Sequence, residues 1–309
     1  MNIKMSLPTG FLDEEVRCDY TVSKEMKKVW AVELDLLSEF QRVCKLHGLK
    51  YSVCGGTLLG AIRHKGFIPW DDDIDVMMMR DEYEKLCKLA DEFKHPYFFQ
   101  TEETDPGSLR GHAQLRNSET TGILKHELKF KRPFNQGIFI DIFPLDNCPT
   151  NPLVFKAGGY LAKFIKKCSS LFANISVRHN SQNDSAIIRG LHRFFLPINK
   201  WLMDVFYNAF EYVIKHLGSK NSEVVSMLSV FYFMEKMKRK KVWMESLTEV
   251  PFENITVSVP VAYEEVLTNF FGDWHQFVKG GSLHGGAYFD TEHPYTYYIK
   301  GEGVLNNPL

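Results

Sequence analysis

The chain has 309 residues, 44% of them hydrophobic and 24% charged, a balance that suits one large or two moderate globular domains. Its formal net charge of −1 provides no overall attraction to nucleic acid, so no nucleic-acid partner is expected, and any contact with an anionic surface must be local. The six cysteines lack metal or redox spacing, and neither a signal peptide nor a run of roughly 18 apolar residues is present, so we expect reduced thiols in a cytoplasmic protein, with peripheral membrane contact left open.

The hydrophobic pattern predicts an α/β protein that begins with a loosely structured arm, residues 1–20. A helix is expected to start after Ser23 and to end at Gly48. The other expected strands cover residues 49–54, 74–79, 97–101, 112–117, 121–124, 137–146 and 252–259. The other expected helices cover residues 57–65, 81–93, 201–217, 223–236 and 263–271.

A dense motif lies between residues 55 and 76, after the apolar run that ends at Cys54. Gly55 and Gly56 allow a ligand to approach the backbone closely. The following helix, from Thr57 to Lys65, would direct its N-terminal N–H groups at that ligand, which suits a phosphate. Arg63 and Lys65 add positive charge, so this motif indicates a phosphate-binding site.

Four carboxylates follow within five residues, at positions 71, 72, 73 and 75. Such crowding is costly unless a cation lies among them. On a strand, Asp73 and Asp75 would share one face, which favours Mg²⁺ or Mn²⁺ because hard cations prefer oxygen ligands. A solvated acidic loop is the alternative. An EF-hand is excluded, because Val76 stands where the sharp turn of that loop needs glycine.

A third informative residue is Asp141, alone in the apolar run from Ile138 to Phe143. A carboxylate in such a strand is costly unless it is paired or binds a cation. The alternative is a structural aspartate that accepts backbone hydrogen bonds. Arg116 and Lys125 lie between the two acidic strands and either contact phosphate or are surface charges.

The composition changes after residue 150. From Asn151 to Leu202 there are eight lysines or arginines and one acid, Asp184, with apolar residues interleaved at helical spacing. One interpretation is a helical hairpin that packs on the core with solvated lysines. The other is a surface that contacts an anionic membrane or a lipid-linked acceptor.

The motif from Gly55 to Val76 resembles the hallmark of the LicD family of phosphotransferases, which includes the fukutin-related transferases. That family is similar to the nucleotidyltransferase superfamily, whose pattern is a glycine pair, an Asp-x-Asp strand and a third carboxylate on a later strand. Asp141, within a LicD-like Asp-Ile-Phe-Pro-Leu-Asp run, matches the third carboxylate. The resemblance is dense from about residue 34 to 146 and returns faintly at 270–274.

The resemblance implies an α/β (α+β) fold with a nucleotidyltransferase-type mixed sheet and an appended helical region. We expect a catalytic core at 1–150, a basic helical insertion at 151–245 and a C-terminal segment at 246–309 that packs back on the core. The implied reaction moves a substituted phosphate, such as phosphocholine, from a CDP-linked donor, CDP-choline first, to a hydroxyl of a glycan or its lipid-linked precursor.

The implied roles fall on residues of the motifs above. Asp73, Asp75 and Asp141 would hold the metal and carry the catalysis. Phosphate contacts would come from Gly55, Gly56, Thr57, Arg63, Lys65, Arg116 and Lys125. Two other functions stay open: a glycosyltransferase in which Asp-x-Asp binds Mn²⁺ and a nucleotide sugar, and a catalytically inactive protein that docks on membranes.

Overall fold

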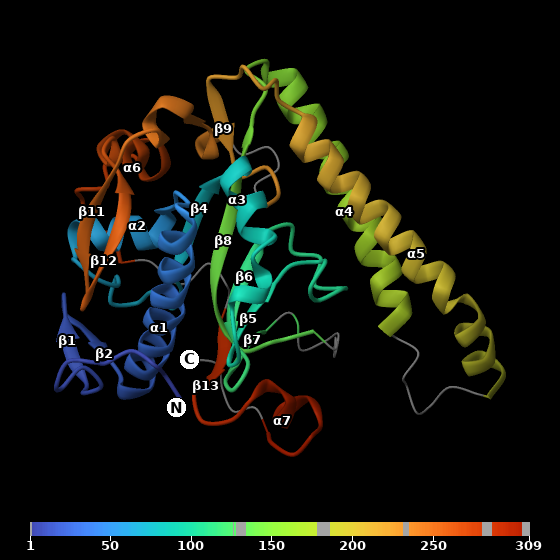
Figure 1. The fold of residues 1–309 in the computed structure, drawn as a ribbon, viewed down its shortest axis with the longest axis horizontal. Coiled ribbons are helices and arrows are strands. Elements are labelled where there is room, and N and C mark those ends of the chain that lie inside the picture. Colours follow the sequence, from blue (N-terminus) through green and yellow to red (C-terminus); the bar gives the residue numbers. More distant parts are fainter. Residues whose placement is uncertain are drawn as a thin grey trace.

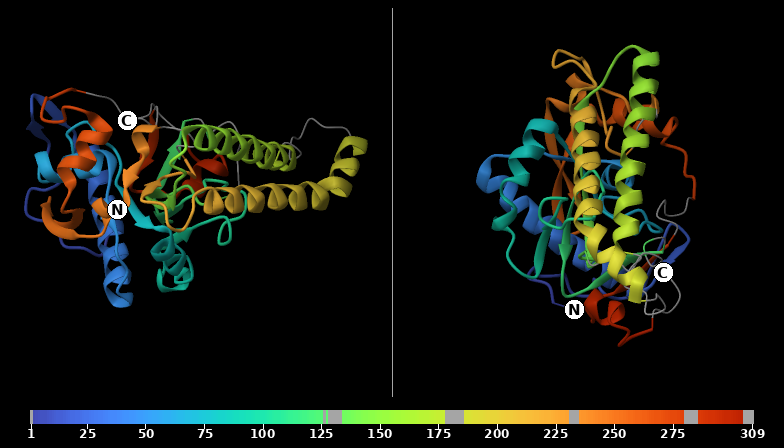
Figure 2. Two further views of the ribbon diagram at one scale, coloured as in Figure 1. Left: turned by 90° about the horizontal axis from the view of Figure 1, so that it is seen from above. Right: turned by 90° about the vertical axis from the view of Figure 1, so that its right-hand side faces the viewer.

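A computed structural model describes residues 2–125, 127, 134–177, 186–230, 235–279 and 286–304, with side chains 176–193 outside the description. A mixed β-sheet lies at the centre, and a long pair of helices extends away from it to one side (Figures 1 and 2). This confirms the α/β expectation. Residues 178–185, which contain Asp184, lie outside the described residues.

Helices and mostly short strands are interspersed along the described part of the chain. The α-helices are α1 (Lys24–His47), α2 (Gly55–Arg63), α3 (Arg80–Cys87), α4 (Pro152–Val177), α5 (Ala186–His216), α6 (Tyr263–Phe271) and α7 (Tyr295–Ile299), with 3₁₀ turns at η1 (Ala90–Glu92), η3 (Glu235–Met237) and η4 (Lys241–Met244). The strands are β1 (Glu15–Arg17), β2 (Tyr20–Val22), β3 (Ser52–Val53), β4 (Asp75–Met79), β5 (Tyr97–Gln100), β6 (Ala113–Asn117), β7 (Thr121–Leu124), β8 (Ile138–Asn147), β9 (Val224–Ser226), β10 (Arg239–Lys240), β11 (Leu247–Phe252), β12 (Ile255–Pro260) and β13 (Ala287–Asp290).

Strand β8 is the middle of the central sheet. It pairs parallel with β4 and antiparallel with β6, and its last residues pair antiparallel with β9. The order runs β10-β9-β8-β4-β3, and β5 joins through β6. Because neighbours cover both edges of β8 and its side chains are buried, the apolar run that the sequence shows there is what a central strand requires.

Helix α1 agrees with its expected bounds. The Ser23 hydroxyl caps it by accepting a hydrogen bond from the Met26 N–H at 3.2 Å, and Gly48 ends it in the left-handed conformation at φ 64°. The helix contacts β6 and β8, and its buried face includes Trp30, Leu34 and Phe40. Its position matters for the site because Trp30 and Glu33 lie beside the acidic segment.

Several sequence expectations are wrong. The helix expected at 223–236 is absent from the described part of that range, where Val224–Ser226 forms β9 on the edge of β8. The β-branched residues Val224 and Val225 favour a strand, and the pairing with β8 stabilises this strand instead of a helix. The strand expected at 252–259 is confirmed as β12, but it pairs with β11, which was not expected, in a hairpin that turns at Glu253, whose φ is 51°. The N-terminal arm also forms a hairpin, β1 and β2.

The C-terminal elements return to the core. Strands β11 and β12 lie against α2 and β3, and α6 also contacts α2. Strands β9 and β10, which fall inside the range expected as a helical insertion, are members of the central sheet. Helix α5 is continuous from Ala186 to His216 with Pro197 inside it, so residues 201–217 do not form a separate helix.

Candidate functional site

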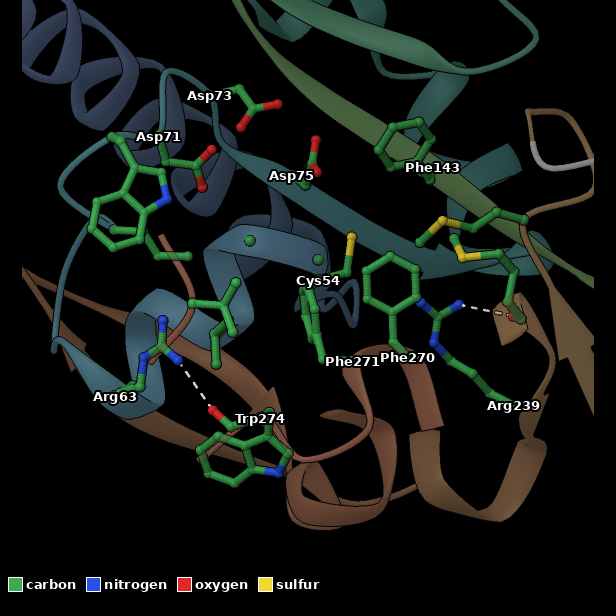
Figure 3. A pocket seen from close by; sticks show the side chains of 18 of the residues that line it. Cys54, Arg63, Asp71, Asp73, Asp75, Phe143, Arg239, Phe270, Phe271 and Trp274 are labelled. Atoms are coloured by element: carbon green, nitrogen blue, oxygen red, sulfur yellow. Dashed lines mark hydrogen bonds between the residues drawn. The ribbon is translucent and has the colours of Figure 1, made fainter. Parts of the chain in front are cut away.

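A cavity of about 420 Å³ opens at the beginning of β4 (Figure 3). The N-terminal half of α2 and the acidic segment before β4 form one side. Residues around β10, α6 and the segment that follows α6 form the other side. The lining residues are Cys54, Gly55, Gly56, Leu59, Arg63, Ile68, Trp70, Asp71, Asp73, Asp75, Phe143, Met227, Met237, Arg239, Phe270, Phe271, Asp273, Trp274, Gln276 and Val278.

Three aspartates line one end of this pocket: Asp71, Asp73 and Asp75. The sequence analysis placed Asp73 and Asp75 together on one strand. Strand β4 begins only at Asp75, so Asp73 lies in the segment before the strand. Both nevertheless face the pocket, which agrees with a shared side. Asp71, Asp72 and Asp73 each offer a carboxylate oxygen within 4.8 Å of the others.

The glycine pair lets these carboxylates approach helix α2. Gly55 has φ 56°, and a Cβ there would lie 3.1 Å from Asp75 Oδ2. A Cβ on Gly56 would lie 2.4 Å from Asp71 Oδ2, a distance that real Cβ atoms do not reach. The glycines therefore make room for the acidic residues, and the positive end of the helix dipole stabilises the negative charges beside it.

Helix α1 supports the acidic segment from behind. The Trp30 indole donates a hydrogen bond to the Asp71 carbonyl oxygen at 3.0 Å. Glu33 is 1% exposed, and its Oε2 atom has no hydrogen-bond partner among the described residues. Burial, and then the charge of Asp73 and its neighbours, raises the pKa of Glu33 well above its usual value. The sequence analysis missed Glu33 because, from the sequence alone, it is one of several charged residues on a long helix.

Asp141 is placed by the sheet directly beside Asp75. The two are register partners on the adjacent parallel strands β8 and β4, and neighbouring strands are about 4.8 Å apart. The expectation that the strand of Asp141 lies beside the strand of Asp75 is thus confirmed. The Asp141 side chain is 4% exposed and does not line the cavity. Its Oδ1 atom accepts hydrogen bonds from Gln114 Nε2 at 2.6 Å and lies 3.0 Å from His112 Nε2.

Arg116 lies behind this carboxylate and not at the pocket surface. It is fully buried, and it donates hydrogen bonds to Gln100 Oε1 at 2.7 Å, to the Gly137 carbonyl oxygen at 2.6 Å and to Gln114 Oε1. The expectation that Arg116 contacts phosphate is therefore corrected. Its guanidinium orients Gln114, which in turn donates to Asp141.

Four other expected phosphate ligands have different positions. The Thr57 hydroxyl is buried and accepts a hydrogen bond from the Asp75 N–H at 2.8 Å, so it positions Asp75 and does not line the cavity. Lys65 and Lys125 are exposed and also lie outside the cavity lining. Arg63 lines the cavity, but its Nη1 donates to the carbonyl oxygen of Trp274 at 3.0 Å. Arg63 therefore ties α2 to the segment after α6.

Arg239 is the basic residue that the sequence analysis missed. It is 4% exposed, lines the cavity from β10, and makes no ion pair among the described residues; its Nη1 donates to the Met237 carbonyl oxygen at 3.3 Å (Figure 3). Burial lowers the pKa of its guanidinium. In sequence it is one of several basic residues at 236–241, so only the fold distinguishes it from its neighbours.

Aromatic rings form much of the remaining cavity wall. Trp70 and Phe143 come from the N-terminal half of the chain. Phe270, Phe271 and Trp274 come from α6 and the residues after it (Figure 3). The weak motif at 270–274 was the sequence signal for the α6 part of this wall. With acidic groups nearby, such rings suit a ligand that carries a positive, weakly hydrated group.

The acidic end of the cavity fits a hard divalent cation. Carboxylate oxygens of Asp71, Asp72 and Asp73 converge within the spacing that a single ion needs, and the fold holds them together despite their mutual repulsion. Asp71 belongs to this donor set, although the sequence analysis gave the metal to Asp73, Asp75 and Asp141. The role of Asp75 and Asp141 as ligands stays a prediction.

Comparison with known proteins gives two kinds of similarity. Residues 48–147, which contain the glycine pair, the aspartates and β8, match the family model described as LicD/FKTN/FKRP, nucleotidyltransferase domain. Over 248 residues the chain is 27% identical to the lipopolysaccharide cholinephosphotransferase LicD of Haemophilus influenzae, an alignment that covers 78% of this chain and 88% of that protein. A shorter stretch of 82 residues is 34% identical to an uncharacterized protein of Rickettsia prowazekii, 26% of this chain and 29% of that one.

Proposed function

The chain is a LicD-family protein, and on that premise we propose that it transfers phosphocholine from CDP-choline to a hydroxyl group of a glycan or its lipid-linked precursor. The observation that carries the proposal is the division of one cavity into an acidic end, a buried arginine and an aromatic wall. Each part suits one component of such a donor: the diphosphate with its cation, a phosphate oxygen, and the trimethylammonium group.

The acidic end would carry the metal-dependent part of the reaction. Asp71, Asp73 and Asp75 would hold Mg²⁺ or Mn²⁺, and the bound ion would neutralise the diphosphate. Thr57 holds the Asp75 backbone in place, and Asp141 lies beside Asp75 in the sheet. Positioning and charge stabilisation of this kind provide most of the catalysis in phosphoryl transfer.

The chemical step is a substitution at the phosphorus that bears choline. The acceptor oxygen forms a bond to that phosphorus, and the bond from phosphorus to the bridging oxygen breaks. CMP leaves, and the hydroxyl proton passes to a carboxylate of the acidic end. Arg239, whose guanidinium lies buried in the wall, would donate hydrogen bonds to phosphate oxygens as their charge changes.

The aromatic wall would select the head group. Choline presents a quaternary ammonium ion that cannot donate hydrogen bonds, and aromatic faces bind such ions through their quadrupoles. Phe271 and Trp274 are positioned for this role by α6 and by the Arg63 contact with the Trp274 carbonyl oxygen. A polyol such as glycerol would gain nothing from these rings, so the wall favours a choline donor.

The test is a donor panel with the purified protein. CDP-choline, CDP-glycerol, CDP-ribitol and a nucleotide sugar would each be incubated with Mg²⁺, with Mn²⁺ and with EDTA, with short oligosaccharides or water as acceptors. We expect CMP release from CDP-choline that depends on the divalent cation, and phosphocholine on the acceptor by mass spectrometry.

Two results would overturn the proposal. Release of a nucleoside diphosphate from the nucleotide sugar would identify a glycosyltransferase that uses the same acidic end. Failure to bind any divalent cation in titration calorimetry, with no turnover of any donor, would leave a catalytically inactive binding protein.

A further inference from the structure

The helical hairpin of α4 and α5 extends beyond the sheet (Figure 2). It exposes apolar side chains along both helices. On α4, Tyr160, Phe164 and Leu171 recur at helical spacing and are 62%, 63% and 56% exposed. On α5, Phe194 and Trp201 recur seven residues apart and are 72% and 62% exposed. The remaining members of these exposed stripes are Leu153 and Leu161 on α4, and Ile198, Val205 and Tyr212 on α5.

Packing of the hairpin on itself does not account for these side chains. The seam between the helices is already filled by buried residues, among them Phe155, Ala162, Met203 and Phe210. Those residues lie on the opposite side of each helix from the exposed stripe, because positions such as 203 and 210 are about half a turn from 194 and 201. Each helix therefore has two apolar faces, one buried in the seam and one exposed among the described residues.

Most charges beside the exposed faces are positive. Helix α4 contains four lysines and no acidic residue, and α5 has none before Asp204. Lys156, Lys163 and Lys167 follow each other at intervals of seven and four residues along one edge of the α4 stripe. Lys166 is different, because its ammonium is buried against the carbonyl oxygens of Arg110 and Ser229. The exposed Lys156 and Lys167 are thus positioned for an external partner.

We propose that the α4–α5 hairpin docks on an anionic lipid membrane surface, with its exposed aromatic and aliphatic side chains in the interface and its lysines among the head groups. Large apolar residues mixed with basic residues, with few carboxylates, are the composition of helices that lie in that interface. No helix in the described ranges is long and apolar enough to cross a bilayer. A second copy of the hairpin is a poorer occupant, because it would bring like charges together.

The inference does not depend on the proposed activity and can be tested without a donor. Vesicles of phosphatidylcholine, with or without phosphatidylglycerol, would be mixed with the full chain and separated by flotation. One variant reverses Lys156, Lys163 and Lys167 to Glu. Its matched control reverses Lys24, Lys88 and Lys94, which are exposed on the body of the protein, and so changes the net charge equally.

A second variant removes the apolar contribution and keeps the charge. It replaces Phe164, Phe194 and Trp201 by Ser, and its control replaces Val16, Leu46 and Val242, which are similarly exposed on the body. All replaced side chains are on the surface, so each variant should fold, which thermal unfolding would verify.

We expect the parent and both controls to float with the anionic vesicles and to be released by added salt. Each lysine near an anionic surface contributes about 1 kcal/mol, and about 1.4 kcal/mol corresponds to a tenfold change in affinity. The reversal of three lysines should therefore weaken vesicle binding about 100-fold or more. The Ser variant should also lose binding. Absence of flotation by the parent, or unchanged flotation by both hairpin variants, would overturn the proposal. So would a dimer in solution that the Ser variant dissociates, without vesicle binding.

Discussion

Replacing Arg239 by Met is the sharpest single test of the site. The side chain keeps its length and loses its charge and its hydrogen-bond donors. A hydrogen bond to a charged group contributes about 1.5–3 kcal/mol, so kcat/KM for CDP-choline should fall roughly 10- to 150-fold if the guanidinium contacts a phosphate oxygen. An Arg239→Lys variant should recover part of the loss, because it restores charge without the planar fork.

The expected effect on stability has the opposite direction. Arg239 is buried, its guanidinium has no ion-pair partner among the described residues, and burial lowers its pKa. A buried cation of this kind costs free energy in the fold. The free energy of unfolding of Arg239→Met should therefore be unchanged or higher than that of the parent.

Arg116 provides the matched control. It is equally buried but donates hydrogen bonds to Gln100, Gln114 and the Gly137 carbonyl oxygen. Arg116→Met removes a donor from all three acceptors, and Gln100 Oε1 keeps the Arg110 Nε–H at 3.3 Å. The other two lose their Arg116 donor at about 1–3 kcal/mol each, so unfolding should cost at least about 2 kcal/mol less than in the parent. The two variants separate a functional arginine from a structural one with the same substitution.

The assays are CMP release under steady-state conditions and urea unfolding followed by circular dichroism. If Arg239→Met turns over CDP-choline within twofold of the parent, the residue does not contact the reacting phosphate. If it is destabilised as much as Arg116→Met, Arg239 is a structural residue and the reasoning from its unpaired burial is wrong.

The remaining predictions concern the acidic end and the aromatic wall. Asp73→Asn and Asp75→Asn should each lower turnover on the order of 10²-fold or more and weaken Mg²⁺ binding in calorimetry, and near-normal turnover at saturating Mg²⁺ would contradict their role. Asp141→Asn should lower activity at least about tenfold if the carboxylate must be ionised, whereas a silent change would make it a structural hydrogen-bond acceptor. Phe271→Leu should raise KM for CDP-choline about 2- to 30-fold and leave CDP-glycerol unaffected, and equal effects on both donors would exclude a choline contact. Burial raises the pKa of Glu33, so its contribution to stability is complete below its unfolded pKa of 4.5 and is lost as the pH rises toward the folded-state pKa. In EDTA, Glu33→Gln should therefore gain stability over the parent as the pH rises above 4.5, and parallel pH profiles of the two proteins would refute this.

Much of the site could be read from local sequence because its parts are close together along the chain. Gly55, Gly56 and the aspartates lie within about twenty residues, and their chemistry is specified by glycine conformation and by carboxylate crowding. Asp141 was recognisable from its apolar surroundings, and the parallel pairing of β4 with β8 placed it beside Asp75 as expected. The bounds of α1 were also predictable, since a cap residue at Ser23 and a glycine at 48 mark its ends locally.

The basic residues could not be sorted in the same way. A lysine or arginine has a long side chain, and its role depends on what surrounds its end and not on its neighbours in sequence. Arg116 was expected at the phosphate and is a buried support, while Arg239 was passed over and faces the cavity. Lys166 and Lys167 are adjacent in sequence, yet one is hydrogen-bonded in the interior and the other is exposed.

The sequence by itself determined the acidic and glycine-rich half of the cavity, because those residues need only their immediate neighbours to define their geometry. Tertiary structure alone decided the other half, which strand β10 and helix α6 bring from more than 150 residues away. It also decided that residues 224–226 join β8 as a strand, since the unpaired edge of β8 offered hydrogen bonds that a local helix could not supply. Local pattern fixes what depends on spacing along the chain, and packing fixes which distant side chains meet.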